Sequence, residues 1–124
     1  NFGYTDYSKK QYDSLKSLIF FLKKNFFISN EDIVFHSDIA PNRKEDPGER
    51  FFIKKIGINR FNNKKTKKKY TIDEMLKLYG FHISYIKNYK SFCIRAVKRS
   101  LNYAVINSSQ SKKFIKDFYN LIFT

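Results

Sequence analysis

The stretch that decides the fold of this chain is IVFHSDIAPNRKEDPG, residues 33–48. It opens with the apolar run Ile33–Phe35, whose β-branched and aromatic side chains are typical of a short buried strand. Two prolines then restrict φ, and Gly48 allows a turn that a Cβ would obstruct. We therefore expect a strand that gives way at His36 to an ordered loop.

Three side chains of this loop are candidates for metal chemistry: His36, Lys44 and Asp46. A catalytic zinc uses three protein ligands, with water in the fourth position, and both imidazole nitrogen and carboxylate oxygen are suitable donors. His36 and Asp46 could supply two of the three. Lys44 lies two residues before Asp46, so in an extended segment both side chains would point the same way. Its ammonium group could then stabilise an oxyanion.

Each of these residues also has a simpler interpretation. A lone histidine after an apolar run is more often a satisfied core or surface residue, and His82, the other histidine of the chain, has no partner at a ligand spacing. An Asp-Pro-Gly string is usually a turn, and the Lys-Glu-Asp string before it is usually a solvated charge cluster. Asp38 fits local hydrogen bonding better than metal binding, because short acidic side chains readily accept from nearby backbone N–H groups.

In combination, these residues resemble the zinc-dependent N-acetylmuramoyl-L-alanine amidases related to phage lysozyme-type amidases and peptidoglycan recognition proteins. Members carry a segment like G-H-S-D-I-A-P-x-R-K-x-D-P-G, and this chain keeps every position except the first glycine, which is Phe35. The resemblance implies that His36 and Asp46 bind Zn2+ and that Lys44 is the catalytic lysine near the scissile carbonyl. It also implies hydrolysis of the amide between N-acetylmuramic acid and L-alanine in peptidoglycan or its fragments.

The resemblance also implies parts that this sequence does not contain. The family's first zinc ligand is a histidine on an earlier strand, followed by an acid-base residue, whereas no histidine precedes His36 here. We therefore expect the carboxyl-terminal part of an amidase, with little or no activity by itself. An alternative of another class is a non-catalytic peptidoglycan-binding remnant of a split or truncated amidase. From the family we expect a location in the cell envelope or periplasm of a bacterium.

The residues before the loop indicate the rest of the expected domain. Ser8 and Gln11 form a capping-box pattern, and apolar residues then recur every three or four positions, which predicts an amphipathic helix over about residues 9–24. We expect its apolar stripe to pack on a sheet that includes Ile33–Phe35. The expected fold class is thus an α/β amidase domain over residues 1–61, represented by a helix, a strand and the zinc loop.

The remaining residues predict a separate all-α module. Residues 62–69 are polar and basic and are expected to be a linker, and residues 70–124 contain three apolar-periodic segments. A capping box at Thr71 and a glycine at position 80 bound the first expected helix; residues 91–103 and 111–123 are the other two. The module resembles the three-helix peptidoglycan-binding modules that follow some of these amidases.

Composition limits the partners of the chain. The net charge is +14, with 25 Lys and Arg against 11 Asp and Glu, and the densest basic run is residues 64–69. No nucleic-acid-binding motif accompanies these lysines, so we do not expect nucleic acid as a partner. The resemblance implies peptidoglycan or muropeptides instead. The sequence has no run of about twenty apolar residues, so it predicts no transmembrane segment. A single cysteine excludes an intrachain disulfide.

Overall fold

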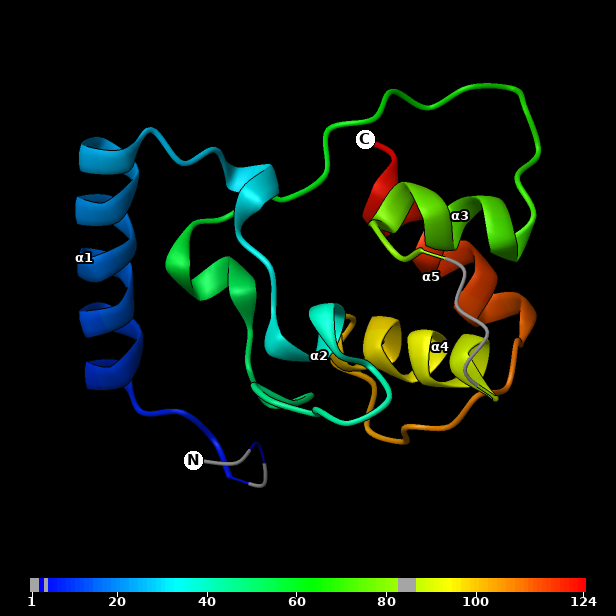
Figure 1. Ribbon diagram of the computed structural model, residues 1–124, viewed down its shortest axis with the longest axis horizontal. Coiled ribbons are helices and arrows are strands. Elements are labelled where there is room, and N and C mark those ends of the chain that lie inside the picture. The colour runs from blue at the N-terminus through cyan, green and yellow to red at the C-terminus, as the bar shows by residue number, and fades with distance from the viewer. Residues whose placement is uncertain (1–2, 4, 83–86) are drawn as a thin grey trace.

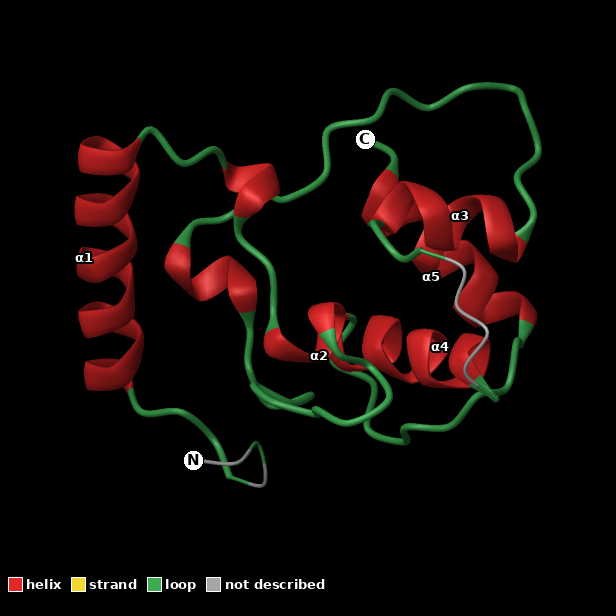
Figure 2. Ribbon diagram, in the orientation of Figure 1, coloured by secondary structure: helices red, strands yellow, loops and turns green. Residues whose placement is uncertain are grey.

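All regular elements of the computed structural model are helical within the residues it describes, which are residue 3, residues 5–82 and residues 87–124 (Figures 1 and 2). The only β-type pairing among them is an isolated parallel bridge between Asn63 and Phe123. The α/β fold class expected from the sequence is therefore wrong for this part of the chain. The elements in chain order are α1 (Lys9–Phe26), η1 (Asn30–Asp32), α2 (His36–Ile39), η2 (Ile53–Ile56), α3 (Ile72–Tyr79), α4 (Tyr89–Ser100) and α5 (Lys112–Ile122), where η marks a 3-10 helix.

The expected strand at residues 33–35 is extended but unpaired. Ile33 has φ −92° and ψ 108°, and Phe35 has φ −83° and ψ 156°, so the backbone does adopt β geometry. However, the N–H of Ile33 donates to the carbonyl oxygen of Asn30 at 3.3 Å, and that of Phe35 donates to Oδ2 of Asp38 at 2.9 Å. These two N–H groups are bonded to local acceptors and are not available to a neighbouring strand, so no ladder forms within the described residues.

The first predicted helix is confirmed, and it runs two residues further than expected. Ser8 Oγ accepts a hydrogen bond from the N–H of Gln11 at 3.2 Å, and Gln11 Oε1 accepts from the N–H of Ser8 at 2.8 Å. This capping box satisfies two backbone donors that would otherwise lack partners at the start of α1. The helix lies at one side of the molecule and packs against η2 instead of a sheet (Figure 1).

A small aromatic cluster joins α1 to the segment around η2. Tyr12 stacks on Phe51 with ring centroids 5.4 Å apart, and Phe35 meets Phe51 edge-on at 5.5 Å. Such pairs stabilise a core beyond the area that they bury. The buried members of this N-terminal cluster are Tyr12, Phe35, Phe51, Ile56 and Ile58.

The three helices expected after residue 70 are also present. Thr71 caps α3 through the predicted capping box, and Gly80, at φ 123°, follows its last residue. Ser111 Oγ accepts from the N–H of Phe114 at 3.1 Å and caps α5. The second helix, α4, ends at Ser100 and not at residue 103, because Leu101 leaves helical geometry at ψ 0° and Asn102 follows at φ 60°.

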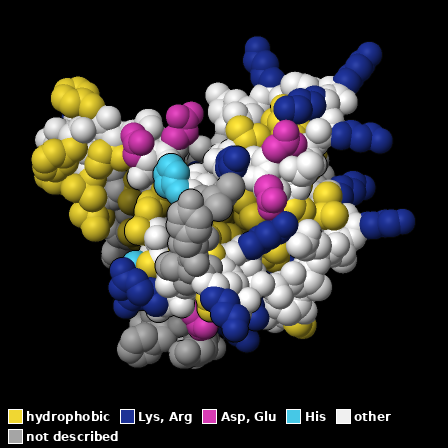
Figure 3. Space-filling view, turned by 45° about the vertical axis from the view of Figure 1, so that its right-hand side comes forward, with side chains coloured by type: hydrophobic (Ala, Val, Ile, Leu, Met, Phe, Trp, Pro, Cys, Tyr) yellow, Lys and Arg dark blue, Asp and Glu magenta, His cyan; other side chains and the backbone are white. Residues whose placement is uncertain are grey.

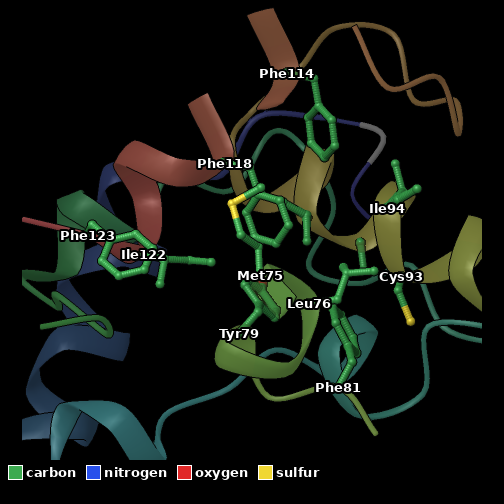
Figure 4. Packing of buried hydrophobic residues seen from close by; sticks show 12 residues of the cluster. Met75, Leu76, Tyr79, Phe81, Cys93, Ile94, Phe114, Phe118, Ile122 and Phe123 are labelled. Carbon is green, nitrogen blue, oxygen red and sulfur yellow. The ribbon is translucent and has the colours of Figure 1, made fainter. Parts of the chain in front are cut away.

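These three helices enclose the main hydrophobic core (Figure 4). Phe114 and Phe118 of α5 stack with centroids 5.7 Å apart, and both are fully buried. Tyr79 of α3 stacks on Phe81 at 4.9 Å. We call this set the tail core; its buried members are Met75, Leu76, Tyr79, Phe81, Cys93, Ile94, Ala96, Val97, Phe114, Phe118, Ile122 and Phe123.

The expected linker passes beside the end of the chain. The N–H of Thr124 donates to the carbonyl oxygen of Asn63 at 2.8 Å, and the N–H of Lys65 donates to that of Thr124 at 3.3 Å. The hydroxyl of Tyr119 donates to the carbonyl oxygen of Thr66 at 3.2 Å. The basic segment is thus tied to α5 at several points, and the division into residues 1–61, 62–69 and 70–124 stays a prediction.

Candidate active site

The two predicted metal ligands lie side by side. His36 begins the single turn of α2, and Nδ1 of its ring is 3.1 Å from Oδ2 of Asp46. A backbone hydrogen bond holds the two ends of the loop together, since the N–H of Ser37 donates to the carbonyl oxygen of Asp46 at 3.1 Å. Both side chains are 48% exposed, so the pair faces solvent.

This spacing fits two ligands of one metal ion. Two donors about 2.0–2.1 Å from a tetrahedral zinc lie roughly 3.3 Å apart, close to the 3.1 Å observed here, which is also an ordinary hydrogen-bond distance. In the part of the chain that the structure describes, no group of three His, Cys, Asp or Glu side chains could hold a metal ion. The distance between His36 and Asp46 is thus compatible with two ligands of one ion, and no third donor joins them among the described residues.

Lys44 lies in the same loop, just after the turn that follows α2. Its N–H donates to the carbonyl oxygen of Ala40 at 2.9 Å, next to a similar bond from Arg43 to the same oxygen at 3.1 Å. These bonds close the turn and fix the backbone position of Lys44. Its assignment as the lysine beside the scissile carbonyl stays a prediction.

The end of the loop requires glycine at position 48. Gly48 has φ +83°, and a Cβ built there would lie 2.9 Å from Cα of Gly3. Side chains are disfavoured at such φ values, and the close backbone contact leaves no room to move. The turn inferred from the Asp-Pro-Gly string is thus confirmed, and it holds Asp46 next to a tightly packed segment.

Tyr7 supports the loop from the other side and was missed by the sequence analysis. Its hydroxyl donates to the carbonyl oxygen of Pro47 at 2.7 Å. Burial raises the pKa of Tyr7, and the neighbouring Tyr12 and the carboxylate of Asp46 raise it further. No local signal could have identified Tyr7, because its partner lies forty residues away in the sequence.

A groove of about 380 Å³ leads to the His36–Asp46 pair. Its walls are apolar side chains of α1, of the extended segment 33–35 and of Phe51 and Ile56. Its polar lining residues include Tyr7, Gln11, His36 and Asp46. An apolar cleft with a few convergent polar groups is the usual form of a small-molecule site.

Asp38 points away from this groove into the protein. It accepts the hydrogen bond from the N–H of Phe35, as the sequence predicted, but it also forms a buried ion pair with Arg60 at 2.8 Å. Tyr79 of α3 donates its hydroxyl to Oδ1 of Asp38 at 2.6 Å. Sequence spacing contained no signal for either partner, because both contacts are long-range.

Comparison with known proteins supports the family suggested by the loop. Residues 1–49 match the family model described as N-acetylmuramoyl-L-alanine amidase, and the matched segment contains His36, Lys44 and Asp46. The match covers less than half of the chain and none of helices α3–α5. No curated protein and no solved structure matches the chain. The family similarity therefore indicates an amidase-type hydrolase and a peptidoglycan substrate in general terms.

Proposed function

We propose that this chain carries part of the active site of a zinc-dependent N-acetylmuramoyl-L-alanine amidase, in which His36 and Asp46 are metal ligands. The 3.1 Å approach of His36 Nδ1 to Asp46 Oδ2 carries this proposal. The family match over residues 1–49 supports it, because the match names the amide that such enzymes cleave. The substrate would be peptidoglycan or a soluble muropeptide.

The residues of the chain would divide the work of amide hydrolysis. A bound zinc ion supplies an activated water and polarises the scissile carbonyl. His36, as the neutral imidazole, and the carboxylate of Asp46 would hold that ion at the mouth of the groove. Lys44 would stabilise the negative charge that develops on the carbonyl oxygen. Tyr7 would keep Asp46 in place through the carbonyl of Pro47.

A complete site needs a third protein donor from beyond the described residues. With two ligands, zinc binding is expected to be weak, because affinity depends on the number of deprotonated donors that the fold presents. We therefore expect the 124-residue chain by itself to show little or no turnover. The second candidate is a non-catalytic peptidoglycan-binding protein, which the family match over residues 1–49 also supports in its substrate.

The proposed location is the cell envelope or periplasm, where the substrate lies. The net charge of +14 would assist approach to an anionic wall and would make that approach sensitive to salt. None of the helices described is long and apolar enough to cross a membrane.

Zinc titration by calorimetry tests the metal site. The expected result is binding of one zinc ion by the unaltered chain, and loss of that binding in His36→Ala and in Asp46→Ala. His82→Ala is the matched control, because it removes the other histidine and should leave binding unchanged. Zinc binding that survives both loop substitutions, or that disappears in the control, would exclude the proposed ligands.

Hydrolysis of a muramoyl-peptide tests the reaction. The test uses a longer protein that supplies a third zinc ligand. In that protein, His36→Ala and Asp46→Ala should abolish turnover, whereas Lys44→Ala should keep zinc binding and lower kcat. Turnover that Lys44→Ala leaves unchanged would exclude the proposed role of this lysine. Peptidoglycan binding without hydrolysis in that same protein would favour the non-catalytic candidate.

A further inference from the structure

A buried polar cluster connects the loop to the tail helices. Its centre is the carboxylate of Asp38, whose side chain is 4% exposed, paired at 2.8 Å with the guanidinium of Arg60, whose side chain is 6% exposed. The hydroxyl of Tyr79 donates to the same carboxylate at 2.6 Å and lies 2.7 Å from Oγ of Ser100. The loop, the segment before the basic run and α3 thus meet at one carboxylate, and α4 joins them through the contact of Ser100 with the Tyr79 hydroxyl.

Both oxygens of this carboxylate are engaged. Oδ2 receives the N–H of Phe35 and the guanidinium of Arg60, and Oδ1 receives the hydroxyl of Tyr79. The guanidinium is held in turn between aromatic rings, 5.1 Å from the centroid of Phe35 and 5.3 Å from that of Tyr79. A buried charge with three partners has little freedom to rotate, because any other position would leave it unpaired in the interior.

Asp38 is connected to the His36–Asp46 pair through α2. Asp38 and His36 share the single turn of α2, so rotation of this turn moves both side chains together. The N–H of Ser37, from the same turn, donates to the carbonyl oxygen of Asp46 at 3.1 Å. The orientation of α2 therefore sets the distance between His36 and Asp46.

Helix α4 and the turn after it hold the same loop at other points. Arg99, with a side chain 10% exposed, lies 3.4 Å from the carboxylate of Glu45. The amide of Asn102 donates to the carbonyl oxygens of Glu49 and Phe51, both at 2.8 Å. These contacts reach Glu45 in the loop and Glu49 and Phe51 just after it, and α2 packs on α4.

We propose that Asp38, Arg60 and Tyr79 are positioning residues for the His36–Asp46 pair, so that the tail helices hold the candidate metal-binding loop in shape. The metal part of this inference rests on the proposed function, whereas the geometric part does not. A tail that acts in this way contributes to the site even though residues 70–124 lie outside the family match.

Tyr79→Phe tests the inference, because it removes one hydroxyl and keeps the buried ring. Two quantities are measured: hydrogen exchange of the Ser37 amide in the metal-free chain, and zinc affinity by titration. We expect Ser37 exchange to accelerate about tenfold relative to Phe118 in the tail core, and zinc affinity to fall at least about tenfold. Tyr103→Phe is the matched control, since the Tyr103 hydroxyl donates to Asp117 and does not contact α2.

The exchange measurement separates positioning from general stability. If Ser37 and Phe118 accelerate equally, Tyr79 only stabilises the tail and the inference is wrong; unchanged Ser37 exchange is equally decisive against it. If the unaltered chain binds no zinc while Ser37 still responds selectively, the proposed metal function fails and the positioning role stands. If Tyr79→Phe does not fold, Arg60→Lys is the second variant, because residue 60 contacts the same carboxylate from another segment. This variant must show the same selective acceleration of hydrogen exchange at Ser37.

Discussion

The two hydrophobic clusters of this molecule differ in how completely they are covered. In the tail core, Ala96, Val97, Phe114, Phe118 and Ile122 are all 0% exposed. In the N-terminal cluster the most deeply buried residues, Tyr12 and Ile56, are each 5% exposed. Figure 3 shows hydrophobic side chains gathered at the surface over α1. The large apolar residues exposed on this helix and its C-cap are Leu18, Phe20, Phe21, Phe26 and Phe27, between 53% and 93% exposed.

This difference bears on function because the groove of the candidate site is lined by the N-terminal cluster, the less completely buried of the two. The tail helices supply most of the fully buried side chains, whereas α1 contributes a single buried side chain, Tyr12. The His36 loop lies between the two and depends on tail contacts through Asp38.

Truncation of a core phenylalanine should separate the two regions most strongly. Phe118→Ala removes a ring that is 0% exposed and should lower the free energy of unfolding by about 3–5 kcal/mol. Phe21→Ala removes a ring that is 58% exposed on α1 and should change it by less than about 0.5 kcal/mol. Urea unfolding followed by circular dichroism measures both. Equal losses would show that α1 is buried in solution as fully as the tail core.

Loss of the buried cation should have the next largest effect. Arg60→Met leaves the Asp38 carboxylate buried without its charged partner and should cost about 3 kcal/mol. The exposed pair of Lys9 and Asp13 in α1 is the control, since Lys9→Ala should leave the unfolding midpoint unchanged. If Arg60→Met were as stable as the original chain, the ion pair would not hold the two regions together.

Alkaline pH should weaken the tail core through its buried thiol. Burial raises the pKa of Cys93 from its ordinary 9.0 to about 11, so the folded state keeps the proton longer than the unfolded state. This contribution is fully present below pH 9.0 and is lost as the pH rises towards about 11. Unfolding measured from pH 8 to pH 11 should show Cys93→Ala losing about 2 kcal/mol less than the original chain. An identical pH profile for both would contradict the buried thiol.

Helix caps should show the smallest effects and reveal whether the regions unfold together. Ser8→Ala and Ser111→Ala each remove a side-chain acceptor at a helix start and should cost about 1 kcal/mol. Hydrogen exchange then locates the loss. Ser8→Ala should accelerate exchange in α1 while α5 stays protected, because the N-terminal cluster is the smaller of the two. Uniform acceleration of both helices would indicate one cooperative unit.

Local signals account for what could be predicted of the fold. Capping boxes at Ser8 and Thr71 and the glycine at position 80 involve residues within a few positions of each other, and each marked a helix end that the structure contains. The prediction of a strand at residues 33–35 was wrong because a strand also needs a neighbouring strand to pair with. Composition indicated an extended segment, but whether its N–H groups pair across a sheet depends on residues far away in the sequence.

The candidate site was predictable in the same limited sense. The motif placed His36 and Asp46 in one loop, and the structure brings them within 3.1 Å. Tyr7, Arg60 and Tyr79 support that loop from distant positions, and no spacing rule relates them to it. Asp38 shows the limit most clearly, since its local bond was expected and its two long-range partners were not.

By itself, the sequence determined the starts of α1, α3 and α5, the proline-bounded and glycine-ended loop, the charge of +14 and the resemblance to amidases. Only the tertiary structure decided that residues 33–35 pair with no strand, that the large apolar side chains of α1 are exposed, and that Asp38 is buried against the tail helices. The physical reason is distance along the chain. Caps and turns are satisfied by neighbours in sequence, whereas burial, ion pairing and strand pairing depend on which remote segments fold against one another.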